Sequence, residues 1–260
     1  MKTRRRILTA AFAAVLLGST AASAQDFRWH GAIPQGRAIE VKGVNGDVRA
    51  EPSSTNEVEV VAEKRSRRDN PEDVRIDVVP HGGGVTICAV YPNREGSRPN
   101  ECAPGNGGHM NVQNNDVTVR FTVRVPARVT FIGRTVNGEV EATRLNGDVE
   151  LNTVNGSATF STTGMGRAST VNGSIRGEMG RADWSDTLQM QTVNGSITLT
   201  LPQTLNTDVR VATVNGDINT DFPLTVSGRI SRRRLEGTIG GGGRTLALES
   251  VNGSITLKRE

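Results

Sequence analysis

The sequence predicts an all-β fold, a β-solenoid that stacks like a single-stranded β-helix, with a less regular β region at its N-terminal end. Three observations predict it. The tripeptide Val-Asn-Gly recurs with a period near twenty, apolar residues make up only 35% of the 260 residues, and aromatic residues make up 3%. Such a period marks a repeat architecture, and a narrow coil interior favours β-branched and small aliphatic side chains. An antiparallel β-sandwich of ordinary hairpins is the alternative.

Residues 1–24 have the layout of a bacterial secretory signal peptide. A charged segment at 2–6 precedes an apolar stretch at 7–17, and small residues at 22–24 suit cleavage after Ala24. The alternative, an N-terminal membrane anchor, is disfavoured because the apolar stretch is too short to span a bilayer core. No second apolar run follows, so we expect no transmembrane segment after signal cleavage. The predicted location is the periplasm or the outside of the cell. The arginines leave both general secretion and twin-arginine export open.

The net charge of +4 comes from this leader. It holds four of the 31 Lys and Arg residues and none of the 27 Asp and Glu residues. The rest of the chain is therefore formally neutral, and it has no global field that would attract nucleic acid. We expect no nucleic-acid partner.

An irregular β region is expected over residues 25–130, with one loop that needs a tether. Cys88 and Cys102 enclose thirteen residues, most of them in the polar stretch 92–115 that has little periodic pattern, and an exported protein meets oxidising conditions. We therefore predict a disulfide between them. Zinc bound with His81 and His109 is the alternative, but the spacings differ from those of structural zinc sites.

The β-solenoid repeat region is expected over residues 131–260, and Val44-Asn45-Gly46 is an earlier copy of its motif. In a two-residue Asn-Gly hairpin, Val193 would face Ser196, which puts a core residue and a polar residue on the same face. We predict instead that each strand bends at a corner and continues, with Met190, Val193 and Ile197 all pointing inward. Asn and Gly suit the corner because both tolerate left-handed backbone.

The predicted repeat corners are the asparagines of these motifs, and successive ones are expected to form a hydrogen-bonded ladder. Asn146 is expected to form a second corner on the opposite side of one coil. Leu235-Glu236-Gly237 is interpreted as a decayed copy of the motif. The corners are Asn45, Asn137, Asn146, Asn155, Asn172, Asn194, Asn215 and Asn252.

The sequence contains no motif that predicts a reaction. It lacks the nucleophile elbow, the P-loop and the HExxH zinc motif. Glu139, Asp148 and Asp217 follow corner glycines and are interpreted as turn-forming surface residues. We therefore predict no catalytic residue, no cofactor and no metal site.

An export signal followed by Val-Asn-Gly-[Asp/Ser]-[Val/Ile] repeats over residues 38–260 resembles the bacterial putative-adhesin domains of unknown function. The resemblance implies an exported or membrane-linked protein with a β-solenoid-like fold, and it brings no catalytic residues. Some members are linked with envelope-stress responses, which the resemblance extends to this chain as an expectation.

Two functions follow from the sequence and the resemblance. The first is a non-enzymatic exported envelope protein, an adhesin or interaction scaffold. It would bind an unknown envelope or surface partner, protein or glycan, along one face of the repeat. The alternative is a polysaccharide-binding or polysaccharide-active β-helix enzyme, against which the scarcity of aromatic platforms stands.

Overall fold

The computed structural model describes residues 27–226, 231 and 233–260, so the predicted signal peptide at 1–24 lies outside the described residues. The described residues form strands and one 3-10 turn, η1 (Pro71–Asp73). The strands are β1 (Phe27–Gly31), β2 (Ala38–Lys42), β3 (Val48–Pro52), β4 (Val58–Arg65), β5 (Arg75–His81), β6 (Gly84–Val90), β7 (Thr118–Val125), β8 (Thr130–Arg134), β9 (Val140–Leu145), β10 (Val149–Asn152), β11 (Ala158–Thr162), β12 (Gly166–Ser169), β13 (Ile175–Met179), β14 (Thr187–Asn194), β15 (Ile197–Leu201), β16 (Thr207–Asn215), β17 (Ile218–Thr220), β18 (Thr225–Val226), β19 (Arg234–Ile239), β20 (Thr245–Asn252) and β21 (Ile255–Arg259).

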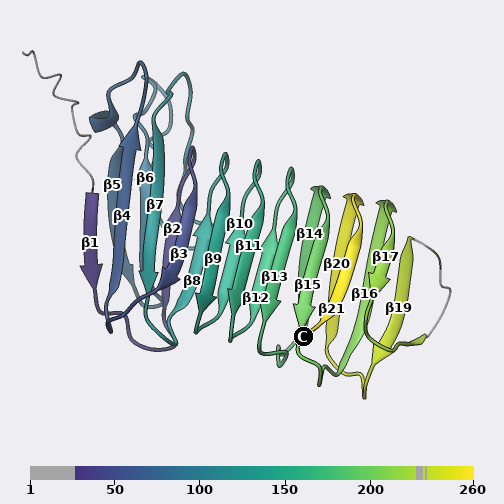
Figure 1. The fold of residues 1–260 in the computed structure, drawn as a ribbon. Coiled ribbons are helices and arrows are strands. Elements are labelled where there is room, and N and C mark those ends of the chain that lie inside the picture. The colour runs from purple at the N-terminus through teal and green to yellow at the C-terminus, as the bar shows by residue number, and fades with distance from the viewer. Residues whose placement is uncertain (1–26, 227–230, 232) are drawn as a thin grey trace, which may run out of the picture.

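Two long sheets lie face to face along the whole stack (Figure 1). Sheet A has ten strands in the order β1-β4-β7-β3-β9-β11-β13-β15-β21-β17. Sheet B has eleven in the order β18-β19-β16-β20-β14-β12-β10-β8-β2-β6-β5. Each repeat coil gives one strand to each sheet and pairs in parallel with the coils beside it, as β10 does with β8 and β12. The predicted all-β, solenoid-like fold is confirmed.

Antiparallel pairing is confined to the two ends of the stack. At one end β1, β4 and β7 pair antiparallel in sheet A, and β5 pairs antiparallel with β6 in sheet B. At the other end β19 pairs antiparallel with β16 and β18. The antiparallel sandwich considered above is therefore wrong for the body of the fold, where the strands are parallel.

The core is the thin layer between the sheets, and it is filled by alternate residues of each strand. In β15, Ile197, Leu199 and Leu201 are fully buried, while the threonines between them face outward. The Phe160 ring fits into this layer because glycines make room for it. A Cβ atom at Gly166 would lie 1.9 Å from the Phe160 ring, and one at Gly177 would lie 2.3 Å from it. The low aromatic content thus follows from the width of the coil.

The order of the coils departs from the chain order at the C-terminal end. The last coil, β20–β21, is inserted between β14–β15 and β16–β17, so that Leu248 pairs with both Met190 and Val211. The interpretation of Leu235-Glu236-Gly237 as a repeat corner is wrong. These residues belong to β19, where Gly237 lies opposite Val209 in an antiparallel pair. Glu236 also has no side-chain amide that could donate to the row of corner asparagines.

Candidate functional site

Seven of the eight predicted corner asparagines lie in one row, along the edge where each coil crosses from sheet B to sheet A. Each side-chain Nδ2 donates to the Oδ1 of the preceding asparagine over 2.7 to 2.9 Å. The order along this asparagine ladder is Asn45, Asn137, Asn155, Asn172, Asn194, Asn252 and Asn215. Stacked amides of this kind hold identical positions of neighbouring strands in register.

Asn146 lies apart from the ladder. It follows β9 at the opposite edge of the stack, where its backbone carbonyl accepts from the Arg128 amide over 2.5 Å. Its side chain is exposed and makes no hydrogen bond within the described residues. Asn146 therefore marks a second turn of one coil and does not belong to the repeated edge.

Asn146 is expected to deamidate faster than the internal ladder residue Asn155. The reaction needs the next backbone nitrogen to attack the side-chain amide carbon, which releases ammonia and gives a succinimide. The Gly156 nitrogen donates to the Asn172 carbonyl and the Asn155 amide is held in the ladder, whereas Gly147 has no such bond within the described residues. Peptide mapping by mass spectrometry after mildly alkaline incubation measures both rates. Equal rates would show that the ladder gives no protection.

A second row of hydrogen bonds lies beneath the ladder, and the sequence reasoning missed it. Two residues before each ladder asparagine except Asn45, a buried hydroxyl side chain donates to the corner glycine carbonyl of the neighbouring coil. Thr192 donates in this way to Gly173 over 2.8 Å. The donors are Thr135, Thr153, Thr170, Thr192, Ser250 and Thr213. Because Thr or Ser recurs two residues before these asparagines, the sequence could have indicated this row of hydrogen bonds.

Replacing Thr192 by Val is expected to lower the free energy of unfolding by about 1–3 kcal/mol, because the Gly173 carbonyl loses its buried partner. Thr198→Val is the matched control, since the half-buried Thr198 hydroxyl makes no hydrogen bond within the described residues. Chemical denaturation measures both variants. A Thr192→Val variant as stable as Thr198→Val would show that the hydroxyl row does not stabilise the fold.

The motif valines form an apolar stripe on the surface beside the ladder. We call them the valine stripe: Val136, Val154, Val171, Val193, Val251 and Val214, with between 38% and 54% of their surface exposed. The prediction that Val193 points inward with Met190 and Ile197 is wrong, because Val193 is 39% exposed. Strand β14 alternates strictly, so Met190 and Thr192 face the core and Val193 faces out.

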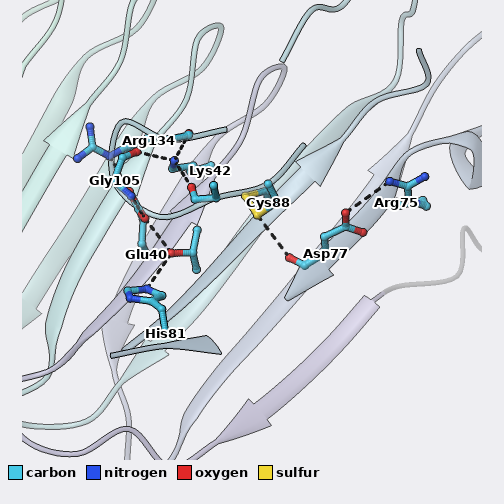
Figure 2. Close-up of a disulfide and its surroundings, with 12 residues drawn as sticks. Glu40, Lys42, Arg75, Asp77, His81, Cys88, Gly105 and Arg134 are labelled. Carbon is cyan, nitrogen blue, oxygen red and sulfur yellow. Dashed lines mark hydrogen bonds and ion pairs between the residues drawn. A yellow bond between two sulfur atoms is a disulfide. The ribbon is translucent and has the colours of Figure 1, made fainter. Parts of the chain in front are cut away.

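The loop closed by Cys88 and Cys102 lies over the outer face of sheet B (Figure 2). The structure joins the two cysteines in the expected disulfide, so neither sulfur is free for the zinc alternative. The side chain of Lys42 of β2 points into the loop. Its Nζ donates to the backbone oxygens of Ala103 over 2.6 Å and of Gly105 over 2.5 Å. Burial lowers the pKa of Lys42, an effect that neighbouring Glu40 opposes.

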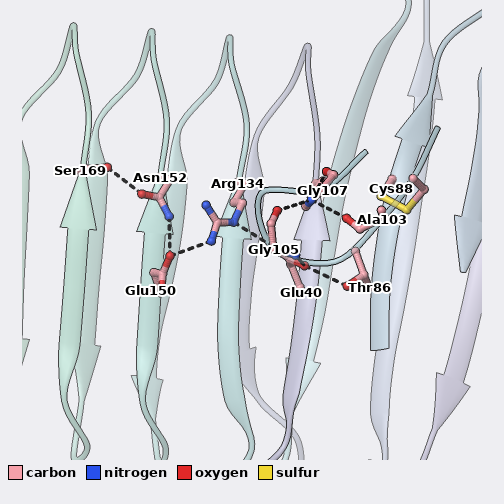
Figure 3. A network of polar contacts seen from close by, with 12 residues as sticks. Glu40, Thr86, Cys88, Ala103, Gly105, Gly107, Arg134, Glu150, Asn152 and Ser169 are labelled. Carbon is pink, nitrogen blue, oxygen red and sulfur yellow. Dashed lines mark hydrogen bonds and ion pairs between the residues drawn. A yellow bond between two sulfur atoms is a disulfide. The ribbon is translucent and has the colours of Figure 1, made fainter. Parts of the chain in front are cut away.

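Glu40 ties this loop to the repeat coils (Figure 3). It is only 3% exposed, and it accepts from the Gly105 amide and from the Thr86 hydroxyl, both over 2.9 Å. Its other oxygen accepts from Arg134 Nε over 2.9 Å, and Arg134 bonds Glu150 of β10 over 2.8 Å. A buried charge is costly unless it is paired and hydrogen-bonded. Here every oxygen of Glu40 has a partner, so the network holds the loop in one place.

The structure places the remaining polar candidates apart from one another. Glu139 and Asp217 follow ladder asparagines, whereas Asp148 lies at the opposite edge and accepts from the Met165 amide over 2.9 Å. The described part of the chain holds no group of three or more His, Cys, Asp or Glu side chains placed to bind a metal ion. Among the same residues, no helix is long and apolar enough to cross a membrane.

A family model described as Toastrack DUF4097 matches residues 133–258. It confirms the resemblance to the putative-adhesin family of unknown function. A search of curated proteins found no match.

Solved structures similar to the chain include three bacterial proteins. A putative cell adhesion protein from Clostridium sporogenes is 11% identical, with 91% of this chain and 100% of that chain covered and a TM-score of 0.47. A putative adhesin from Bacteroides fragilis is 11% identical, with 92% and 98% covered and a TM-score of 0.32. A putative adhesin from Parabacteroides merdae is 15% identical, with 90% and 96% covered and a TM-score of 0.24.

Proposed function

We propose that this chain, whose residues 133–258 form a Toastrack DUF4097 domain, is a non-enzymatic, exported interaction scaffold with an adhesin-like role. It binds an envelope or surface partner, protein or glycan, through the valine stripe. The observation that carries the proposal is the outward position of six motif valines on one edge of the stack. Contiguous exposed apolar surface on a soluble protein marks an interaction site more often than isolated apolar residues do.

The stripe is both regular and rigid. Parallel strands lie about 4.8 Å apart, so six neighbouring valines form a line of about 24 Å. The asparagine ladder and the buried hydroxyl row fix each corner relative to the next. A partner with an extended or repetitive surface can therefore meet several valines at once without ordering flexible loops, which lowers the entropic cost of binding.

The groove beside the stripe adds polar groups to this surface. Next to Val193, Val251 and Val214 it is lined by Gln191 and Arg233, among others. An apolar line flanked by amide and guanidinium donors suits a partner that offers both an apolar face and hydrogen-bond acceptors. The disulfide supports an oxidising compartment outside the cytosol. A role in envelope stress is a variant of the same proposal, with a regulatory protein as the partner.

The test is capture of a partner from envelope fractions by the wild-type chain and by a Val154→Thr, Val171→Thr, Val193→Thr variant. Thr has nearly the shape of Val, so the fold is preserved while the apolar surface is lost. The control replaces Thr198 and Thr256 by Val on the outer face of sheet A. We expect the wild type and the control to capture the same partner, and the stripe variant to lose it at least about tenfold.

Equal capture by the stripe variant would contradict the proposal. Turnover of a polysaccharide that one carboxylate substitution abolishes would favour the enzyme alternative instead.

A further inference from the structure

The asparagine ladder ends at β17, and no further coil pairs with its last corner within the described residues. Within the ladder, the corner glycine amide of each coil donates to the asparagine carbonyl of the next coil, as Gly253 does to Asn215 over 2.9 Å. In the last coil, the Gly216 amide and carbonyl and the Asn215 Oδ1 atom have no partner within the described residues. The same donors and acceptors are satisfied in the six coils before it.

The apolar core is also open at this end. Ile218 begins β17, and its counterparts Ile197 and Ile255 in the neighbouring coils are fully buried, whereas Ile218 is only half-buried. Val214 is 54% exposed, against 38–40% for the other valines of the stripe. The unpaired backbone groups of Gly216 and the exposed surface of Ile218 and Val214 would all be covered by one more coil.

On the sheet B side the last coil is covered. Strand β19 pairs with β16 from Thr207 to Ala212, and the Thr213 amide donates to the Arg233 carbonyl over 2.9 Å. The cover stops at the corner, because β17 is the last strand of sheet A. The open segment therefore begins at Asn215 and includes β17.

We propose that this open edge binds an extended segment of a separate polypeptide, which adds in parallel to β17 and continues the ladder. The six internal junctions define what the segment must carry. Its asparagine donates to Asn215 Oδ1, and an Ile or Val three residues later covers Ile218. The place beside Thr213, where the internal coils have a Thr or Ser, is already taken by Arg233. The required sequence is Asn-Gly-x-[Ile/Val]. Strand addition of this kind takes affinity from the backbone and specificity from alternate side chains.

A second copy of this chain does not offer such a segment. Its first coil would have to accept from Gly216 and Ile218 through the carbonyls of Asn45 and Asp47. Those carbonyls already accept from the amides of Val119 and Phe121 over 2.8 and 2.9 Å. The internal coils are paired on both sides. The partner is therefore a different polypeptide.

The probe is a synthetic peptide with the sequence of residues 252–258, which carries Asn252 and Ile255 in the required pattern. Fluorescence anisotropy measures its binding to the full chain, and hydrogen exchange locates it. We expect saturable binding with slowed exchange at Gly216 and Ile218. The Asn252→Ala peptide should bind about threefold to tenfold more weakly, because one hydrogen bond is lost.

Ile218→Pro in the protein should abolish binding, because it removes the outward N–H, while Ile218→Val should keep it. Proline is tolerated at an edge strand whose N–H faces solvent. If Ile218→Pro does not fold, the peptide variants decide with the wild-type chain. Equal binding of a scrambled peptide, protection elsewhere, or self-association that Ile218→Pro abolishes would overturn the inference.

This inference does not rest on the valine stripe. The Val154, Val171 and Val193 substitutions lie away from β17, so they should leave peptide binding unchanged. Failure of one proposal is therefore distinguishable from failure of the other.

Discussion

Replacing Gly173 by Ala is expected to lower the free energy of unfolding by about 3 kcal/mol, near the upper end of the usual cost of overpacking. A Cβ atom at Gly173 would lie 1.9 Å from the backbone oxygen of Gly156 in the neighbouring coil. A backbone oxygen cannot turn aside as a flexible side chain would. The Gly156 carbonyl also accepts from Thr170, so moving it breaks a buried hydrogen bond.

Gly82→Ala is the matched control for this substitution. Gly82 has no atom within 4 Å of an added Cβ and no left-handed backbone angle. Its replacement should change stability by less than about 0.5 kcal/mol, as is usual at the surface. Urea denaturation of both variants gives the comparison. Equal stability of the two would mean that neighbouring coils do not approach as closely at the corners as the structure has them.

Removing the disulfide by the double substitution Cys88→Ala, Cys102→Ala is expected to lower the free energy of unfolding by about 3 kcal/mol. A cross-link that closes a loop of this length removes about that much conformational entropy from the unfolded chain. The loop should also open more often, because Lys42 and Glu40 then hold it alone. Thermal unfolding with and without reductant measures the effect.

The reduced wild type should match the double variant, and reductant should leave the double variant unchanged. A wild type whose unfolding temperature does not respond to reductant would show that the loop is held entirely by Lys42, Glu40 and its own turns. Hydrogen exchange in the loop amide of Gly105 separates the two cases, since that amide donates to Glu40.

The stacked fold could be predicted because the same Val-Asn-Gly tripeptide recurs at each corner of the stack. A period near twenty predicts a stack of coils. The mismatch across the Asn-Gly pair is not real, because Val193 faces out and Thr192 is buried, so the period alone carries the prediction. The sequence alone did not indicate whether the motif valine faces the core or the solvent. Thr192 looks like a surface residue, and only the carbonyl of Gly173 in the next coil makes its burial favourable. An apolar Val193 beside a polar Thr192 therefore suggests the wrong face.

The order of the last coils is not encoded in any one motif. Asn194, Asn252 and Asn215 stand in nearly identical sequences, so each could locally follow any other. Which coil lies next to which is decided by β19, which pairs antiparallel with β16 and sends the chain back into the stack. In the same way, Glu40 and Lys42 alternate with core residues of β2 and look exposed. The Cys loop that buries them comes from more than sixty residues away.

The open edge at β17 depends on the insertion of the last coil between the two that precede it, and engineered cysteine pairs test this strand order directly. Asn194 and Asn252 are paired neighbours, about 4.8 Å apart as adjacent strands are, which is within reach of a disulfide. Asn194 and Asn215 lie two strands apart, beyond that reach. We predict that Asn194→Cys, Asn252→Cys forms a cross-link under oxidation and that Asn194→Cys, Asn215→Cys does not. Cross-linking of the second pair but not the first would contradict the strand order and, with it, the open edge at β17.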